Sequence, residues 1–289
     1  MRQQLKHGGH AITPVLKGAG LGLRREHLDE LSVAIPAEVE FFEVAPENWM
    51  ELGGYRYKQW QQVIAQRPLV AHGLSLSLGS PAPLDEAFVQ RVGRFLDEYN
   101  IVLYTEHLSW CSDAGHLYDL LPMPFTQEAV EHISARIKRV QEILQRRIAV
   151  ENASFYVNAD MSDMSENRFI REVLKSADCD LHLDVNNVYV NSVNFGFDPQ
   201  QWLQHIPVER VVYMHTAGHY RETHDLIIDT HGEAVIEPVW ALLQQAYHLF
   251  GVHPTLLERD FNIPPLAQLL PEVARIRQYQ DEAHYAAVA

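Results

Sequence analysis

Short apolar runs recur eight times along the chain, and amphipathic stretches lie between most of them. Such a run is typical of a strand buried on both faces, and such a stretch is typical of a helix that covers a sheet. The expected strands are 19–23, 39–44, 69–76, 101–105, 148–150, 181–185, 211–214 and 255–257. The expected helices are 27–33, 57–66, 84–99, 127–145 (with Thr126 as its N-cap), 167–175, 238–250 and 266–279.

This alternation predicts the α/β class and, more narrowly, a single (β/α)8 TIM barrel. Because no linker interrupts it, we expect a loose N-terminal arm at 1–14 and one barrel domain at 15–289. An open, doubly wound sheet is the alternative, and a phosphate-binding GxGxxG after the first strand would favour it. The glycines there, Gly18, Gly20 and Gly22, lack that spacing.

The composition excludes several classes of partner. The net charge of −15 is spread along the chain, which argues against nucleic acid. Cys111 and Cys179 have no CxxC spacing, so we expect two reduced thiols rather than a disulfide or a thiolate zinc site. The sequence shows neither a signal peptide nor an apolar run long enough for a membrane span, and we expect a cytoplasmic protein without a membrane partner.

Polar residues follow nearly every expected strand. The clearest case is 181–187 (LHLDVNN), where an apolar run ends in Asp184 and Asn187. In a TIM barrel the carboxyl ends of all strands face one mouth, so these side chains should meet there. The other strand ends supply Glu43, Glu47, His72, Glu106, His107, Glu151, Asn152, His215, His219, Asp229, His231, Glu258, Arg259 and Asp260. The long loops at 109–125 and 216–237 should hold substrate over this mouth.

One acid or imidazole at a strand end is usually a helix cap, an ion pair or a hydrogen-bonded core residue. Seven of eight strands that end this way would crowd carboxylates into one low-dielectric pocket, at a high cost in repulsion and desolvation. Metal cations remove that cost. Imidazole, carboxylate and amide ligands suit iron, manganese or zinc with open positions, and the candidates are too many for one ion.

We therefore expect two or three metal ions. Asp229 and His231 are two apart, which puts both side chains on one side of an extended segment. The candidate ligands are His72, His107, Glu151, Asp184, Asn187, His215, Asp229, His231 and Glu258. Ordinary structural roles are expected for the remaining histidines considered, His116, His132, His182, His205, His248, His253 and His284. We expect Asn152 and Asn186 to support the ligands, and Arg259 to hold a peptide or pair with Glu43.

Several sequence blocks together resemble one known family. They are FFEVAPENW, HGLSLSLG, YTEHLSW, VENAS, LHLDVNNVYVNSVNFGFDP, MHTAGH, IIDTHGEAV and LLERDFNIP. From about residue 18 to 271, the chain resembles the domain of unknown function 692 (UPF0276) family, which includes the MbnB and TglH enzymes. The resemblance implies a xylose-isomerase-like TIM barrel that uses two or three iron ions (Fe2+/Fe3+) and O2. It also implies a Cys-containing, ribosomally made precursor peptide as substrate (RiPP biosynthesis), and a partner protein that presents the peptide's leader.

The resemblance also implies how the ligands are shared. One central ion would take Glu151, Asp184, His215 and Glu258, and the first three of these would be the catalytic residues. A second would take His72 and His107 and share Glu151. A third would take Asn187, Asp229 and His231. No organic cofactor is indicated.

Two other functions compete with this one. A divalent-metal sugar isomerase or a phosphodiesterase-like hydrolase would also place His, Asp and Glu at the strand ends of a TIM barrel. The isomerase usually needs a Lys near the metal, and we find none at a strand end, while the net charge opposes a nuclease. The chain could instead be a non-catalytic metal-binding or peptide-binding subunit whose partner acts.

Overall fold

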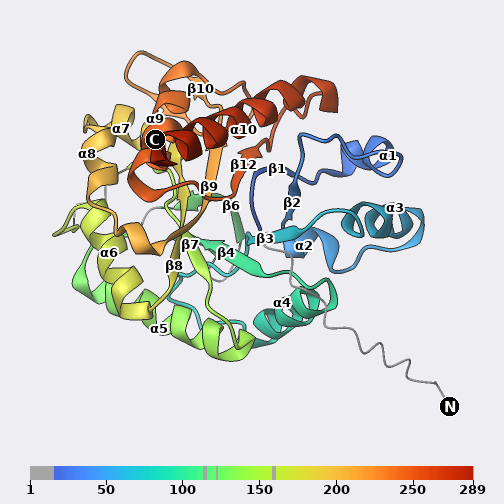
Figure 1. The fold of residues 1–289 in the computed structure, drawn as a ribbon. Helices are drawn as coiled ribbons and strands as arrows, with labels where there is room; N and C mark the ends of the chain where they lie inside the picture. Colours follow the sequence, from blue (N-terminus) through green and yellow to red (C-terminus); the bar gives the residue numbers. More distant parts are fainter. Residues whose placement is uncertain (1–15, 113–115, 122, 158–160, 289) are drawn as a thin grey trace.

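The structure is a computed structural model that describes residues 16–112, 116–121, 123–157 and 161–288. It contains a closed barrel of eight strands, in the order β1-β12-β9-β8-β7-β4-β3-β2 (Figure 1). Every neighbouring pair is parallel, including β1 with β12, which closes the barrel. The barrel strands are β1 (Ala19–Gly22), β2 (Phe41–Val44), β3 (Leu69–Gly73), β4 (Leu103–His107), β7 (Ala149–Glu151), β8 (Asp180–Asp184), β9 (Val211–Ala217) and β12 (Thr255–Glu258).

The eight predicted strands and the TIM barrel are confirmed, and the predicted arm at 1–14 lies outside the described residues. Helices surround the barrel in Figure 1. They are α1 (Leu28–Leu31), α2 (Pro46–Trp49), α3 (Gly54–Ile64), α4 (Glu86–Glu98), α5 (Gln127–Leu144), α6 (Glu166–Ala177), α7 (Val185–Phe195), α8 (Pro199–Gln204), α9 (Glu237–Phe250) and α10 (Leu266–Val288), with short 3-10 helices at Arg25–His27 and Val208–Arg210. The predicted N-cap of α5 is confirmed, because the Thr126 hydroxyl accepts a hydrogen bond from the Ala129 N–H.

Two predicted loops contain strands. The loop after β4 holds an antiparallel hairpin, β5 (Trp110–Ser112) with β6 (His116–Leu121), and the loop after β9 holds β10 (Tyr220–Arg221) with β11 (Ile227–Ile228). β5, β10 and β11 have only two or three residues, which is too short to show a clear alternation of apolar and polar residues. Both hairpins stand outside the barrel sheet.

Helix α7 is the main element that sequence reasoning missed. Its residues, VNNVYVNSVNF, are mostly β-branched or Asn, which favour helices weakly. Two features of the structure compensate for this low helix propensity. The Asp184 carboxylate caps the helix by accepting from the Asn187 N–H at 2.7 Å, and Val185 and Val188 are buried in the core. Gly196, with φ +70°, then ends the helix in a left-handed conformation that glycine adopts without strain.

The barrel interior begins with an apolar layer made of Phe41, Val70, Tyr213 and Leu256, which form a buried cluster separate from the larger core between strands and helices. The Phe41 and Tyr213 rings lie 5.9 Å apart. This layer closes the amino-terminal part of the barrel, so any internal site must lie toward the carboxyl ends of the strands.

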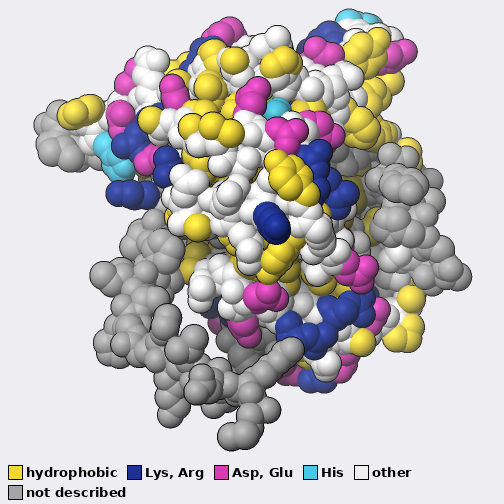
Figure 2. Space-filling model, turned by 90° about the vertical axis from the view of Figure 1, so that its right-hand side faces the viewer, with side chains coloured by type: hydrophobic (Ala, Val, Ile, Leu, Met, Phe, Trp, Pro, Cys, Tyr) yellow, Lys and Arg dark blue, Asp and Glu magenta, His cyan; other side chains and the backbone are white. Residues whose placement is uncertain are grey.

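The surface is mixed in character. On the face that Figure 2 presents, acidic and basic side chains are interspersed among apolar ones, so the net negative charge is not gathered there. Among the described residues, no helix is both long and apolar enough to span a membrane. Cys111 and Cys179 are both free and buried.

Gly20 faces the apolar layer and provides a test of its packing. A Cβ at this position would lie 2.2 Å from the fully buried Phe41 ring. We expect Gly20→Ala to lower the free energy of unfolding by about 1–3 kcal/mol through overpacking. The measurement is urea unfolding followed by circular dichroism.

Gly53→Ala is the control for this test, because no atom lies within 4 Å of a Cβ built there. Gly53 is the N-cap of α3, where alanine is a poorer residue, so a cost of up to about 1 kcal/mol is expected. Equal destabilisation by the two substitutions would show that the layer is not tightly packed at Gly20.

Candidate metal centre

Strand alternation builds the site directly on the apolar layer. Successive inward positions of a strand are two residues apart, so the next inward residue on each strand lies one level closer to the mouth. Above Phe41, Val70, Tyr213 and Leu256 these residues are Glu43, His72, His215 and Glu258, respectively. All four are buried, which makes this level a polar layer inside the barrel.

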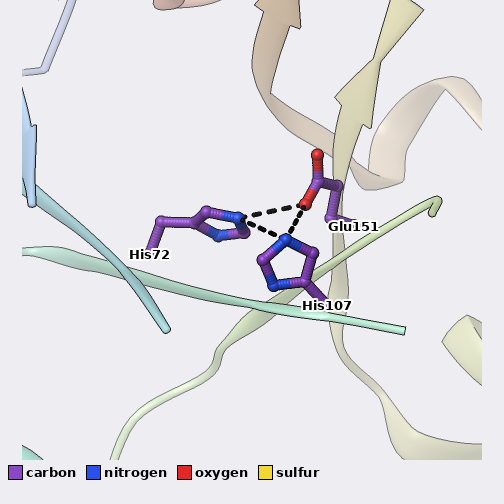
Figure 3. A group of neighbouring side chains, drawn as sticks. All are labelled: His72, His107 and Glu151. Atoms are coloured by element: carbon purple, nitrogen blue, oxygen red, sulfur yellow. Dashed lines mark hydrogen bonds and ion pairs between the residues drawn. The ribbon is translucent and has the colours of Figure 1, made fainter. Parts of the chain in front are cut away.

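The first group consists of His72, His107 and Glu151, from β3, β4 and β7 (Figure 3). The Nε2 atoms of the two imidazoles lie 3.2 Å apart and 3.0 and 3.3 Å from Glu151 Oε2. The other ring nitrogen of each is fixed from outside, His72 Nδ1 by the Thr105 hydroxyl and His107 Nδ1 by the Gly73 carbonyl. Two Nε2 atoms and one carboxylate oxygen therefore converge, as metal ligands do with their orienting partners.

The second group consists of Glu151, Asp184, His215 and Glu258, from β7, β8, β9 and β12. His215 Nδ1 lies 2.9 Å from Glu258 Oε2 and 3.9 Å from both Glu151 Oε1 and Asp184 Oδ2. Glu151 directs one oxygen to each group, so it is placed to bridge two ions.

Glu43 orients the histidine of the second group. Its Oε2 accepts from Tyr213 Oη at 3.0 Å and lies 2.9 Å from His215 Nε2, which leaves His215 Nδ1 for the cluster. A carboxylate behind a ligating imidazole fixes its tautomer and orientation. The expected alternative, a Glu43–Arg259 pair, is wrong: Arg259 pairs with Glu272 of α10 at 2.9 Å. That Arg259 holds a peptide stays a prediction.

The third group lies around His231 in the loop after β11, where its imidazole meets the carboxylates of Glu258 and Asp260. Asp229, the other ligand predicted in this loop, adjoins it. His231 Nε2 lies 2.7 Å from Asp229 Oδ1, but the geometry does not make a hydrogen bond. Asp229 also accepts from the Ser154 hydroxyl and from Asn186 Nδ2, both at 2.8 Å. The predicted supporting role of Asn186 is consistent with this contact.

A clasp made of Arg24, Asp260 and His231 holds this loop to the barrel. His231 adopts φ +47°, which is unusual for a residue with a side chain. Asp260 fixes it twice: its carboxylate lies 3.1 Å from His231 Nδ1, and its N–H donates to the His231 carbonyl at 3.1 Å. Arg24, just after β1, forms an ion pair with the same carboxylate.

Asn187 occupies the first turn of α7 rather than a strand-end loop. Its Nδ2 donates to the Asn152 carbonyl at 3.1 Å and lies 3.5 Å from Glu151 Oε1, so it borders the second group. Asn152 in turn makes a pair of hydrogen bonds with the Asp184 backbone, which is a supporting role of the kind we expected. The predicted placement of Asn187 at the third ion stays a prediction.

Unpartnered atoms show that these residues fit metal ions. A buried polar atom without a hydrogen bond is costly and therefore rare. Among the described residues, the buried side-chain atoms without a partner include Glu151 Oε2, Asp184 Oδ2, Asn187 Oδ1 and His231 Nε2. All four belong to predicted ligands, and a cation is the partner that would satisfy them.

The pKa shifts of these residues also favour metal binding. Burial and the neighbouring Glu151 carboxylate raise the pKa of Asp184 to about 8. Burial opposes ionisation of Glu151 as well, but the imidazoles of His72 and His107 outweigh it and hold its pKa below the usual range. Burial would lower the pKa of His72, yet Glu151 raises it to about 9. Without a cation the cluster has to hold protons, which metal ions displace when they bind.

His182 lies one level below the ligands, in register with Tyr213. Its ring packs edge-on against His215 with centroids 3.9 Å apart, and neither of its nitrogens has a hydrogen-bond partner. Burial and the adjacent His215 hold its pKa well below the usual range, so it is a neutral residue of the barrel interior. Its ring also lies close enough to Glu151 and His215 for the three to hold an ion together, so the structural role that we expected stays a prediction.

Sequence reasoning noticed Glu43, His219 and Asp260 only as polar residues near strand ends. The structure shows what they do: Glu43 and Asp260 orient His215 and His231, and His219 Nδ1 lies 2.8 Å from Asn186 Oδ1. No local pattern assigns these partners, because each is distant in sequence from the residue that it orients.

Comparisons with known proteins agree with the fold and the site. The family model described as RiPP precursor modification enzyme MbnB/TglH/ChrH matches residues 18–281. A UPF0276 protein of Nitrosospira multiformis is 59% identical over 92% of this chain and 94% of its own length. A UPF0276 protein of Shewanella sediminis is 56% identical over 90% and 94% of the two chains.

Solved structures share the fold at low identity. The 3-keto-D-glucoside 4-epimerase YcjR of E. coli has a TM-score of 0.60 at 14% identity and covers 91% of this chain and 99% of its own. Endonuclease IV of Thermus thermophilus has a TM-score of 0.56 at 13% identity and covers 92% and 99%. A xylose isomerase domain protein of Planctomyces limnophilus has a TM-score of 0.56 at 12% identity and covers 93% and 100%.

The fold is thus that of a xylose-isomerase-like TIM barrel, and its buried His and carboxylate clusters are consistent with a multinuclear metal site. The chain belongs to the MbnB/TglH/ChrH family, whose curated relatives carry the name UPF0276. Family and fold together indicate an enzyme.

The clasp predicts a selective loss of metal. We expect Asp260→Ala to release the His231 ring and to weaken binding at the third group about 10–100-fold, as loss of an orienting partner typically does. The first and second groups should keep their ions. Metal ions per chain, counted by mass spectrometry after dialysis, should fall by one.

Asp225→Ala is the control, because Asp225 lies in the same loop and bonds only to Thr223 and His224 among the described side chains. Its metal content should equal that of the unchanged protein. Retention of every ion by Asp260→Ala would contradict the role of the clasp.

Proposed function

We propose that this chain is an iron enzyme that uses O2 to oxidise cysteine residues of a ribosomally made precursor peptide. The observation that carries the proposal is the convergence of buried His and carboxylate atoms, several of them unpartnered, inside a barrel of the MbnB/TglH/ChrH family. The family description names modification of RiPP precursors and supports a peptide substrate.

The donor set fits iron. Imidazole and carboxylate ligands without thiolate suit iron that keeps open coordination positions, and Glu151 is placed to bridge two ions. Bound there, two or three iron ions (Fe2+/Fe3+) would supply binding of the substrate thiol and reduction of O2. The chain contributes the arrangement: Glu43, Thr105 and the Gly73 carbonyl each fix one nitrogen of a ligand imidazole and leave the other for the metal.

Asp184 caps helix α7 in addition to its proposed role as a ligand of the central ion. It uses one oxygen to cap α7 and directs the other, which has no hydrogen bond, into the cluster. The cap fixes the carboxylate relative to Glu151 and His215, the residues that we propose as its catalytic partners. A rigid helix thus holds the central ligand in place.

The rim of the mouth suits a peptide. Large apolar side chains just beyond the carboxyl ends of strands are exposed there: Leu74 after β3, Tyr156 after β7, Tyr220 after β9 and Phe261 after β12. Exposed apolar side chains of this kind bind the side chains of a peptide better than they bind a polyhydroxylated sugar. A partner protein that presents the peptide's leader would dock near the same rim.

A sugar isomerase remains the second candidate, because a sugar epimerase and a xylose isomerase domain protein share the fold of this chain. Such an enzyme usually places a Lys near the metal. The lysines within the described residues, Lys17, Lys58, Lys138 and Lys175, are all exposed, and none lines the candidate metal centre. The donor set supports metal binding in either enzyme, while the absence of a central Lys from this described part of the chain favours the peptide oxidase.

Oxygen consumption tests the proposal. The protein is purified without oxygen, loaded with Fe2+, and mixed with the peptide encoded by a small Cys-containing open reading frame beside its gene, together with any protein encoded there. We expect O2 uptake and a change in peptide mass, measured by an oxygen electrode and mass spectrometry. The same peptide with Cys→Ser should give neither, and failure of the Cys peptide to react would refute the oxidase.

Asp184→Asn tests the central position without removing the helix cap. Asparagine caps helices as well as aspartate does but is neutral and a weaker ligand. We expect iron content to fall and O2 uptake to drop about 100-fold or more, while the melting temperature of the metal-free protein changes little. Asp85→Asn, at the exposed N-cap of α4, is the matched control and should retain full activity. Unchanged iron content and activity in Asp184→Asn would remove Asp184 from the centre.

A further inference from the structure

A second cavity lies outside the barrel, where α6, α7 and α8 meet the segment after β7. Its volume is about 510 Å³, within the range of small-molecule sites. Aromatic side chains line much of it: Phe125, Phe155, Phe195, Phe197 and Trp202. The rings of Phe155 and Phe195 stack with centroids 4.6 Å apart, and Phe125 meets Phe155 edge-on at 5.6 Å.

A carboxylate stands among these rings. Glu166, in the first turn of α6, accepts from Trp202 Nε1 at 2.9 Å and from Asn191 Nδ2 at 3.2 Å. An ionised carboxylate can accept about four hydrogen bonds, so these two contacts use about half of its capacity. Glu166 is itself part of the cavity lining. The lining contains a second carboxylate, Asp198, and one imidazole, His205, and among the described residues it includes no Lys or Arg.

We propose that this cavity binds an organic cation, that is, an ammonium or guanidinium group carried on an apolar stem. Aromatic rings attract cations through their π faces, and the attraction grows when the cation is removed from water. A carboxylate beside the rings supplies the opposite charge and a hydrogen-bond acceptor. The rings alone would accept a neutral apolar ligand, so it is Glu166 that selects a cation.

The ionisation of Glu166 supports this choice. Burial raises the pKa of its carboxyl to about 7, although the hydrogen bonds from Trp202 and Asn191 favour the charged form. The carboxylate is therefore incompletely stabilised by its present partners. A bound cation would stabilise it further, whereas an anion would be repelled.

The cavity adjoins the metal centre but shares no predicted ligand with it. Ser154 donates to Asp229, and the next residue, Phe155, lines the cavity and donates its N–H to Asn191 Oδ1 at 3.1 Å. A cation in the cavity could be a free amine or a Lys or Arg side chain of a bound peptide. Both have the same chemistry, and the experiment separates them.

Calorimetric titration of the full chain at pH 8 tests the inference with two probes of similar shape, phenethylammonium and its neutral isostere 2-phenylethanol. We expect the ammonium ion to bind about tenfold or more tightly. Equal affinities, or no binding of either probe, would overturn the proposal. This comparison uses the unchanged protein, so it holds even where a variant fails to fold.

Glu166→Gln should abolish the preference for the ammonium ion, because glutamine keeps a similar size and loses the charge. Glu172→Gln, on the same helix but outside the cavity lining, is the matched control and should keep it. Persistence of the preference in a folded Glu166→Gln protein, as judged by circular dichroism, would also overturn the proposal.

Two tripeptides then identify the source of the cation, one with a central lysine and one with norleucine, both blocked at their ends. The norleucine peptide is the uncharged control. Tighter binding of the lysine peptide than of both the norleucine peptide and phenethylammonium supports the cation-binding cavity and identifies a peptide side chain. Binding of phenethylammonium alone supports the cavity and identifies a free amine. None of these titrations requires iron or O2, so they stand or fall separately from the proposed oxidation.

Discussion

The structure depends on how the barrel interior tolerates several carboxylates at one level. Glu43, Glu151, Asp184 and Glu258 are all buried near the carboxyl ends of the strands. Burial opposes the ionisation of Glu151, Asp184 and Glu258, and the Glu151 and Glu258 carboxylates oppose that of Asp184 as well. Imidazoles between them supply part of the compensation, since burial would raise the pKa of Glu258 but His231 and His215 hold it well below the usual range. The unpartnered oxygens of Glu151 and Asp184 show that this compensation is incomplete. Cations complete it, so folding of the layer and binding of metal are coupled.

The position of this layer follows from strand geometry. Residues two apart on one strand point the same way, and the apolar layer below fixes which residues point inward. A register shift of one residue on β9 would replace His215 by an outward-facing neighbour and lose Tyr213 from the layer below. Packing of Phe41, Val70, Tyr213 and Leu256 therefore specifies the site as well as the fold.

Much of this was predictable from sequence, for a physical reason. Strands buried on both faces are apolar throughout, so a polar residue at the end of such a strand as β3 or β8 marks the exit from the core. That signal predicted the barrel, and every predicted ligand in β3, β4, β7, β8, β9 and β12 lies in one of the structure's converging groups. Helix α7 was missed because its Val-rich and Asn-rich sequence favours helices weakly, and its stability comes from the Asp184 cap and tertiary burial. Glu43 and Asp260 could not be assigned, since their partners are distant in sequence.

The two proposed sites compensate the charge of their carboxylates in different ways. In the barrel, imidazoles and bound cations would offset the negative charge of carboxylates from several strands. The ligands must keep fixed positions because one residue, such as Glu151, contacts two groups. In the outer cavity, Glu166 lies among aromatic rings and accepts two hydrogen bonds, and no imidazole of the described residues bonds to it. The half-buried Glu166 carboxylate needs a counter-charge less strongly than the cluster does, because protonation near pH 7 removes its charge. The cavity can therefore hold its carboxyl neutral when no cation is bound, as a reversible binding site requires. In the barrel cluster, Asp184 needs a cation to be fully ionised at neutral pH, because its pKa is raised to about 8.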